Sequence, residues 1–199
     1  GITMVMDKGF SLRQALDLVS ICADYTDVVK LGFGTSLLTK DLAKKLQLYK
    51  DANIKTYFGG TLFEAFLVRD MLDDYRRYLD KYKMEYVEVS DGSIQMNHDD
   101  KCEIISQLAK DYTVFSEVGS KEAGVIIHPN KWISMMNKEI EAGAWNVIAE
   151  ARESRTVGIY RPNGNAHVNL IHKILNKVPG EKIMWEAPKK AQQAYFIDL

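Results

Sequence analysis

The chain has 199 residues, of which 46% are hydrophobic, so it is long enough to bury a core and we expect a single domain. Its 26 basic and 27 acidic residues are interspersed and give a net charge of −1, without the long one-signed runs typical of nucleic-acid or membrane partners. Cys22 and Cys102 have no CxxC spacing, so neither a zinc knuckle nor a disulfide framework is indicated, and a reducing cytoplasm is the expected compartment. The first apolar run, Ile2–Met6, is too short for a signal peptide or a membrane span.

Short β-branched runs alternate with longer amphipathic stretches along the whole chain, the pattern of repeated βα units around a parallel sheet. The predicted strands are Ile2–Met6, Asp27–Leu31, Ile54–Phe58, Tyr86–Ser90, Thr113–Glu117, Asn146–Glu150 and Lys182–Glu186. The predicted helices lie near Leu12–Ala23, Lys40–Ala52, Leu62–Tyr82, Asp99–Lys110, Lys131–Ala142 and Val168–Asn176, with a last one from Lys189.

The spacing of these strands predicts the fold class. Consecutive strands start roughly 30 residues apart, the size of one βα unit. This regularity favours an α/β fold of the (β/α)8 TIM type over an open doubly wound sheet. Such barrels typically need about 250 residues, so we expect that the eighth strand is missing from this chain and that the domain spanning residues 1–199 is incomplete at its C-terminus.

Acidic side chains follow most of the predicted strands, at the strand ends where sites of parallel α/β folds lie. They are Asp7, Glu88, Asp91, Glu117, Glu150 and Glu186. Each could pair with a lysine or arginine, but so many acids at one rim would repel one another unless a cation neutralised them. Oxygen ligands without Cys or His favour Mg²⁺ over zinc.

Basic side chains occupy the same loops, at Lys8, Lys30, Lys121 and Arg152. Each could be the ion-pair partner of a neighbouring acid. As a set they suit an anionic substrate that carries phosphate or carboxylate, because arginine binds such groups bidentately and lysine acts as a point charge. Lys121 lies in a loop from which it could act as a proton donor.

Four glycines, Gly32, Gly34, Gly59 and Gly60, follow the second and third predicted strands, where backbone N–H groups could bind an anion. The alternative is that they only permit tight turns. The stretch from Gly32 to Leu37 is a partial dinucleotide fingerprint with leucine in place of the third glycine, and no Walker A motif occurs, which argues against nicotinamide and ATP.

The histidines form no recognisable site. His167 and His172 are five residues apart, off the spacing that aligns two ligands on one helix face, and His98 and His128 stand alone in predicted loops. We therefore expect all four at the surface.

Taken together, the strand-end motifs resemble those of the phosphosulfolactate synthase family over essentially the whole chain. The motifs are Asp7–Gly9, Val29–Ser36, Phe58–Glu64, Val89–Gly92, Ser116–Gly119, Glu150–Ser154 and Glu186–Pro188. The family usually has a glycine-rich stretch after Ser154, where this chain has Arg155, Thr156, Val157 and Gly158.

The resemblance implies a Mg²⁺-dependent barrel enzyme that adds sulfite to phosphoenolpyruvate and forms (2R)-phospho-3-sulfolactate, a step towards coenzyme M or sulfolactate. Sulfite attack at C3 would push electrons into the carboxylate, and a metal and cations would stabilise the enolate-like dianion. A proton must then reach C2. The implied partners are these small anions, with no nucleic acid or membrane, and association into a homo-oligomer stays open.

Matching the motifs assigns Lys121 as the acid that protonates C2. The candidate metal ligands are Glu88, Glu117 and Glu150, with Asp7 and Asp91 as second choices. The groups expected to bind the carboxylate, phosphate or sulfite are Lys8, Lys30 and Arg152, together with the four glycines.

Two other functions remain open. A Schiff-base aldolase would use a strand-end lysine such as Lys30 as its nucleophile. Plant heat-stress-associated relatives resemble the synthase but serve in thermotolerance without catalysis. The presence of Lys121 and of the strand-end glutamates favours catalysis.

Overall fold

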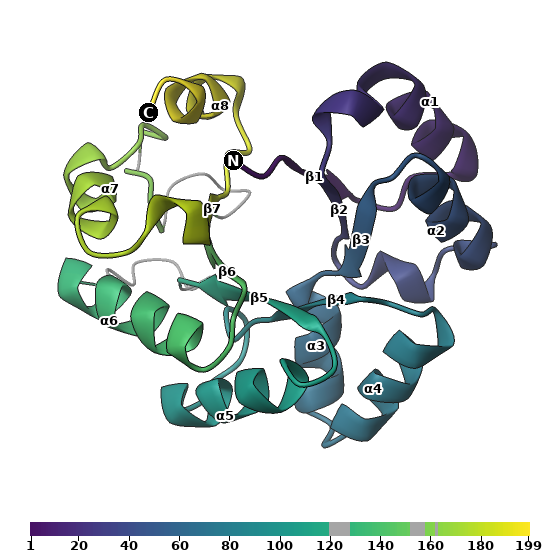
Figure 1. Ribbon diagram of the computed structural model, residues 1–199, viewed down its shortest axis with the longest axis horizontal. Coiled ribbons are helices and arrows are strands. Elements are labelled where there is room, and N and C mark those ends of the chain that lie inside the picture. Colours follow the sequence, from purple (N-terminus) through teal and green to yellow (C-terminus); the bar gives the residue numbers. More distant parts are fainter. Residues whose placement is uncertain (120–127, 152–157, 162) are drawn as a thin grey trace. The chain divides into compact units, whose positions relative to one another are not determined.

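The computed structural model describes residues 1–119, 128–151, 158–161 and 163–199, in which strands and helices alternate along the chain (Figure 1). The strands are β1 (Met4–Asp7), β2 (Val28–Leu31), β3 (Lys55–Phe58), β4 (Tyr86–Val89), β5 (Thr113–Val118), β6 (Asn146–Ala149) and β7 (Ile183–Trp185). The α-helices are α1 (Leu12–Cys22), α2 (Leu42–Asp51), α3 (Gly60–Leu67), α4 (Leu72–Lys81), α5 (His98–Leu108), α6 (Pro129–Glu141), α7 (Val168–Leu175) and α8 (Lys190–Ile197). Short 3-10 helices lie at η1 (Ala23–Tyr25), η2 (Thr35–Leu37) and η3 (Gly180–Lys182).

The order of these elements confirms the predicted α/β alternation, with one exception. The prediction of a continuous helix over Leu62–Tyr82 is wrong, because α3 ends at Leu67 and α4 begins at Leu72. Asp70 between them has a φ of 55°, in the left-handed region, which an α-helix cannot contain. The amphipathic period continues across the break, so the periodicity alone does not reveal it.

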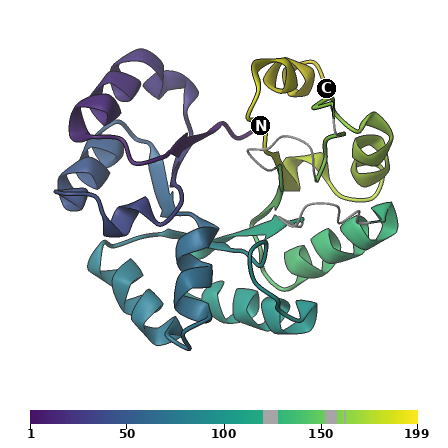
Figure 2. The same cartoon turned by 180° about the vertical axis from the view of Figure 1, so that it is seen from behind.

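The chain divides into two compact units, residues 1–88 with 111–113 and residues 89–110 with 114–199. In the first unit β1, β2 and β3 form a parallel sheet in that order, with Val5 opposite Val29 and Val29 opposite Thr56. Helices α1 and α2 lie side by side next to this sheet (Figure 2). The aliphatic and aromatic residues of β2 and β3 are buried in its core, including Val29, Leu31 and Phe58.

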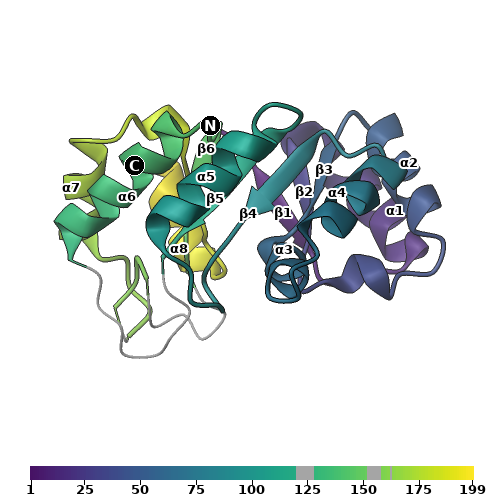
Figure 3. The ribbon, with the colours of Figure 1, turned by 90° about the horizontal axis from the view of Figure 1, so that it is seen from below.

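In the second unit β5, β6 and β7 pair in parallel and in that order, with Glu117 opposite Ile148 and Ile148 opposite Met184. All four residues of β6 are buried, as expected for a strand of a parallel sheet covered on both faces. Helices α5 and α6 run side by side in this unit (Figure 3). No helix among the described residues is long and apolar enough to cross a membrane.

Candidate functional site

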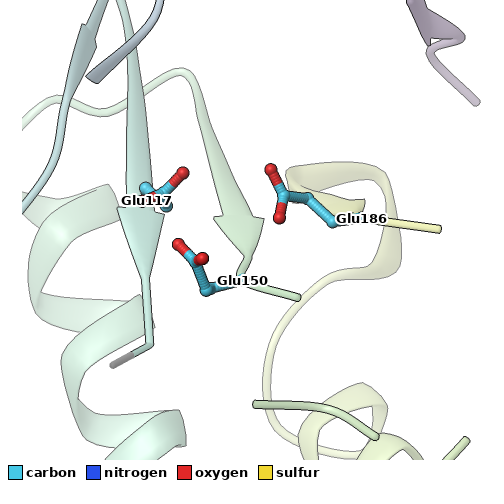
Figure 4. A group of neighbouring side chains, drawn as sticks. All are labelled: Glu117, Glu150 and Glu186. Atoms are coloured by element: carbon cyan, nitrogen blue, oxygen red, sulfur yellow. The ribbon is translucent and has the colours of Figure 1, made fainter. Parts of the chain in front are cut away.

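Three carboxylates come together at the carboxyl ends of β5, β6 and β7. Glu117 is the fifth residue of β5, Glu150 directly follows β6 and Glu186 directly follows β7. One oxygen from each lies within 4.8 Å of the others, and the side chains point toward one another (Figure 4). This convergence follows from the parallel register, because neighbouring strands that end level with one another bring their last side chains to one edge.

Backbone hydrogen bonds extend the strand pairing up to the acids themselves. The Glu150 N–H donates to the Val118 carbonyl at 3.0 Å, and the Glu186 N–H donates to the Ala149 carbonyl at 3.2 Å. The acids are therefore carried by paired, rigid backbone and not by free loops, which limits their movement relative to one another.

Side-chain hydrogen bonds orient two of the carboxylates. Ser90 Oγ donates to Glu117 Oε1 at 2.9 Å, and the Ala151 N–H donates to Glu186 Oε2 at 2.9 Å. The Tyr160 hydroxyl donates to the Glu186 carbonyl at 2.5 Å. Burial and the negative charge of Glu186 raise the pKa of Tyr160 well above its ordinary value, so this hydroxyl keeps its proton as a donor at neutral pH.

Two glycines leave room for Glu150. A Cβ at Gly119 would lie 2.5 Å from the Cβ of Glu150, and a Cβ at Gly158 would collide with the Glu150 carbonyl oxygen. Both also have positive φ angles, +145° and +74°, which L side chains rarely adopt. Neither position can take a larger residue without moving Glu150.

This cluster has the donor chemistry of a site for a hard divalent cation. Glu117 and Glu150 are each 3% exposed, and Glu186 is half-buried. Two carboxylates at this separation repel by about 3 kcal/mol at the effective dielectric of a protein site, and a third adds to that cost. Three oxygen ligands without a nitrogen or sulfur donor fit Mg²⁺, which keeps further positions for water and substrate.

Asp91, a second-choice metal ligand in the sequence, has a buried lysine partner. Its Oδ1 lies 2.9 Å from Lys101 Nζ, and Lys101 is fully buried on α5. Among the described residues Asp91 is not part of the three-carboxylate cluster. Its role as a ligand stays a prediction.

In the first unit the strand-end acid Glu88 is paired with Lys30. Lys30 Nζ lies 2.9 Å from Glu88 Oε1, and their side chains are only 6% and 0% exposed. The same oxygen accepts a hydrogen bond from the Gly60 N–H at 2.6 Å. A Cβ at Gly59 would lie 2.9 Å from the Lys30 Cε, so the absence of a side chain at this position leaves room for the lysine. The N-terminus of α3 thus binds the anion Glu88 of the chain itself.

Asp7, like Glu88, is paired with a buried lysine, which the sequence did not reveal. Lys45 on α2 reaches Asp7 Oδ2 at 2.8 Å, and both side chains are at most 1% exposed. The carboxylate also accepts hydrogen bonds from the Tyr49 hydroxyl at 3.1 Å and from the N–H groups of Gly9 and Phe10. Burial and the Asp7 charge raise the pKa of Tyr49.

The remaining predicted anion-binding groups of this unit have structural contacts of their own. The Gly32 N–H donates to the Asp7 carbonyl and the Gly59 N–H to the Leu31 carbonyl, both at 2.9 Å, so these two donors continue the sheet. Gly34 has a φ of +66°, which a turn requires of glycine. Lys8 is exposed, with Nζ 5.8 Å from the centre of the Phe33 ring. Substrate binding by these groups stays a prediction.

Lys121 and Arg152 lie outside the described residues. Their assigned roles as proton donor and anion-binding group therefore also stay predictions.

A cavity of about 390 Å³ in the first unit lies away from the strand-end residues. It is lined by residues at the opposite ends of β3 and β4, among them Lys55, Thr56, Glu85 and Tyr86. Because the acids lie at the carboxyl ends of the strands, this cavity is not part of the candidate site.

The family model of (2R)-phospho-3-sulfolactate synthase (ComA) matches residues 1–199. The chain belongs to this family. It is 36% identical over 200 residues to the phosphosulfolactate synthase of Bacillus subtilis, covering 99% of this chain and 79% of the relative. It is equally similar, at 36% over 203 residues and with the same coverage, to the phosphosulfolactate synthase of Methanothermobacter thermautotrophicus.

Solved structures show the fold. The 3-hexulose-6-phosphate synthase of Salmonella typhimurium superposes with a TM-score of 0.58 at 14% identity, covering 99% of this chain and 83% of the other. A second 3-hexulose-6-phosphate synthase gives 0.57 at 16% identity, covering 99% and 85%. These are (β/α)8-barrel enzymes, which confirms the predicted fold type.

Proposed function

We propose that this phosphosulfolactate synthase family member catalyses the addition of sulfite to phosphoenolpyruvate and that it uses Mg²⁺ held by Glu117, Glu150 and Glu186. The observation that carries the proposal is the convergence of these three carboxylates at adjacent strand ends, within 4.8 Å of one another. The product is (2R)-phospho-3-sulfolactate.

The proposed ligand set differs from the set that the motifs imply. It keeps Glu117 and Glu150 and adds Glu186, which stands at the end of the neighbouring strand. It leaves out the three acids that already have a buried lysine partner within 3 Å, namely Asp7, Glu88 and Asp91. A carboxylate compensated in this way binds a cation less readily.

The reaction has two chemical steps. The sulfur of sulfite forms a bond to C3 of phosphoenolpyruvate, and the electron pair of the double bond moves to C2 and the substrate carboxylate. Lys121 then gives a proton to C2, as the resemblance implies, and no group leaves. Mg²⁺ held by Glu117, Glu150 and Glu186 would supply positive charge that stabilises the negative charge developing on that carboxylate.

The ordered carboxylates of the second unit would determine the position of a bound Mg²⁺. Ser90 and the Ala151 N–H hold the orientation of Glu117 and Glu186, and the two glycines hold Glu150. Because these groups are oriented before substrate arrives, little reorganisation is needed as charge develops.

The direct test is to incubate the protein with phosphoenolpyruvate, sulfite and Mg²⁺ and to detect phosphosulfolactate by mass. Product is expected with Mg²⁺ and should disappear after exhaustive chelation. Lys121→Ala should lower turnover by about 10²–10⁴-fold, the range for loss of a general acid. Activity that survives chelation contradicts the metal assignment, and near-normal turnover of Lys121→Ala contradicts the proton-donor assignment. Folded protein that makes no product favours the non-catalytic alternative.

The structure argues against the alternative of a Schiff-base aldolase. Its nucleophile must be a neutral amine, whereas Lys30 Nζ lies 2.9 Å from the buried carboxylate of Glu88, which favours the ammonium form. Borohydride should therefore trap no adduct on Lys30 with carbonyl substrates.

We further propose a cytoplasmic enzyme whose product feeds coenzyme M or sulfolactate formation. Cys22 and Cys102 are free thiols, which is compatible with a reducing compartment.

A further inference from the structure

A buried ion pair lies directly behind the carboxylate cluster of the second unit. Lys101 on α5 and Glu139 on α6 are both 0% exposed, and Lys101 Nζ lies 3.0 Å from Glu139 Oε1. Burial alone would lower the pKa of Lys101, but the charges of Glu139 and Asp91 outweigh it and raise that pKa above its usual value. For Glu139, Lys101 and hydrogen bonds from His98 and Ser116 outweigh burial and lower the pKa. Both groups are therefore charged at neutral pH.

The ion pair is tied to the strand that carries Glu117. Lys101 Nζ donates to the backbone carbonyl of Glu117 at 2.6 Å, and Ser116 Oγ donates to Glu139 Oε2 at 2.6 Å. Because side chains alternate along a strand, Ser116 and Glu117 point to opposite faces of the sheet. The pair thus holds β5 from its helix side while Glu117 faces the cluster.

A second connection runs through the loop after β4. Lys101 Nζ also lies 2.9 Å from Asp91, whose preceding residue is Ser90. Ser90 Oγ donates to the Glu117 carboxylate at 2.9 Å. Lys101 therefore binds both the backbone of Glu117 and the loop that orients its carboxylate, so the contacts form a closed ring.

His98 completes the network. Its Nε2 lies 3.1 Å from Glu139 Oε1, and its side chain is 22% exposed. The expectation that all four histidines lie at the surface is therefore wrong for His98, which is half-buried against α6, and for His167, which is half-buried at the start of α7.

We propose that Lys101 and Glu139 are positioning residues that hold Glu117 in the orientation required to bind the divalent cation. This inference rests on the proposed metal function of the cluster. A buried ion pair is weak evidence for stability, because apolar residues of similar volume are often equally stabilising. This pair also makes hydrogen bonds or ion pairs with Ser116, Glu117 and Asp91, which apolar residues could not make.

The test uses Mn²⁺ as a spectroscopic probe of the full chain, by electron paramagnetic resonance and without substrates. The single variant Lys101→Met leaves Glu139 buried without its cation and strongly destabilises the protein. The double variant Lys101→Met/Glu139→Gln removes both charges at nearly constant volume and is expected to fold. Its Kd for Mn²⁺ should rise by about 10–100-fold, the usual effect of removing groups that orient metal ligands.

Ser116→Ala provides a milder variant, because it removes one connection and leaves the ion pair intact. We expect a smaller rise in the Kd for Mn²⁺ in the same direction. For both variants kcat should recover when Mg²⁺ is raised in proportion to the loss of affinity. That recovery separates a positioning role from general damage to the fold.

The matched control is another ion pair between the same two helices. Lys138 Nζ on α6 lies 3.4 Å from Asp99 on α5, and both side chains are more than half exposed. Lys138→Met/Asp99→Asn should leave the Kd for Mn²⁺ within about twofold of the wild type, because exposed ion pairs contribute little to the stability of the structure around them.

The outcomes distinguish this inference from the proposed function. A lower melting temperature of the folded double variant with an unchanged Kd for Mn²⁺ overturns the positioning role and leaves the proposed function intact. Wild-type protein that binds Mn²⁺, loses it in Glu150→Gln and yet makes no product overturns the activity alone, and the weakened binding in the double variant still supports the positioning role. Wild-type protein that binds no Mn²⁺ overturns the metal assignment and the inference together.

Discussion

The strand-end acids of the two units make different contacts, apart from Asp91 of the second unit, which pairs with Lys101. In the first unit Asp7 and Glu88 each lie within 3 Å of one lysine, Lys45 and Lys30, and all four side chains are at most 6% exposed. In the second unit Glu117, Glu150 and Glu186 bring their oxygens within 4.8 Å of one another.

This difference motivates the proposal that the paired acids stabilise the fold and that the clustered acids bind a cation. A buried carboxylate with its own lysine forms a satisfied pair, and breaking that pair leaves an uncompensated buried charge. Three adjacent carboxylates repel one another, and a bound cation would offset that repulsion.

The largest expected effect is on activity in the second unit. Glu150→Gln should lower kcat/KM for phosphoenolpyruvate by about 10³-fold, because Lewis-acid stabilisation is worth several kcal/mol. The melting temperature should change little, since glutamine has nearly the same volume. Steady-state kinetics with saturating Mg²⁺ measure this, with Glu141→Gln on the exposed side of α6 as the control. A loss of less than tenfold would contradict a metal-ligand role for Glu150.

The next largest effect is on stability in the first unit. Lys45→Met should lower the free energy of unfolding by about 3–5 kcal/mol, because Asp7 is left buried without its cation. Adding Asp7→Asn should recover much of that loss. Urea unfolding followed by circular dichroism measures both. Lys44→Met on the same helix is the control, because its side chain is 71% exposed and its loss should cost less than about 0.5 kcal/mol. Equal losses of unfolding free energy in Lys45→Met and Lys44→Met would contradict a stabilising role for the buried pair of Lys45 and Asp7.

A smaller effect should distinguish two buried tyrosines. Tyr160→Phe removes the donor to the Glu186 carbonyl, which should cost about 1–3 kcal/mol of stability and weaken Mn²⁺ binding by up to about tenfold. Tyr49→Phe removes a donor to Asp7 in the first unit and should cost a similar amount of stability, with less effect on Mn²⁺ affinity. Mn²⁺ titration and thermal unfolding of the two variants, compared side by side, test this. Equal losses of Mn²⁺ affinity in the two variants would show that the hydrogen bond from Tyr160 does not position Glu186 for metal binding.

The smallest expected effect is on the alkaline limit of stability. Burial, with a hydrogen bond to Asp80 and the charge of that residue, raises the pKa of Tyr112 from 10.0 to about 12. Between these two values the unfolded chain has released the proton and the folded chain still holds it, so stability falls as pH rises from 10 to 12. Tyr112→Phe should flatten this fall, as measured by urea midpoints at pH 9 to 12. An unchanged slope would contradict the raised pKa.

Local sequence patterns were sufficient to predict the order and type of the elements, apart from the division of one predicted helix into α3 and α4. The predicted strand Thr113–Glu117 differs by one residue from β5, and Asn146–Glu150 differs by one residue from β6. Buried β-branched runs identify such strands whatever surrounds them. The break at Asp70 was missed because a left-handed residue leaves no trace in the amphipathic period.

The site could be predicted only in part. The carboxyl ends of the strands pointed to Glu117 and Glu150 as candidate metal ligands, and Glu186 was recognised as a strand-end acid but left out of that candidate set. Lys45, Lys101 and Glu139 were missed altogether. They stand in helices among other charged residues, and nothing local distinguishes a buried lysine or glutamate from an exposed one.

By itself the sequence determined the α/β alternation, the position of each acid at a strand end and the family motifs, because all three depend on local order along the chain. Only the tertiary structure decided which acids meet a lysine and which meet one another. That choice depends on register between strands and on which helix residues are buried, and both arise from contacts between residues far apart in the chain.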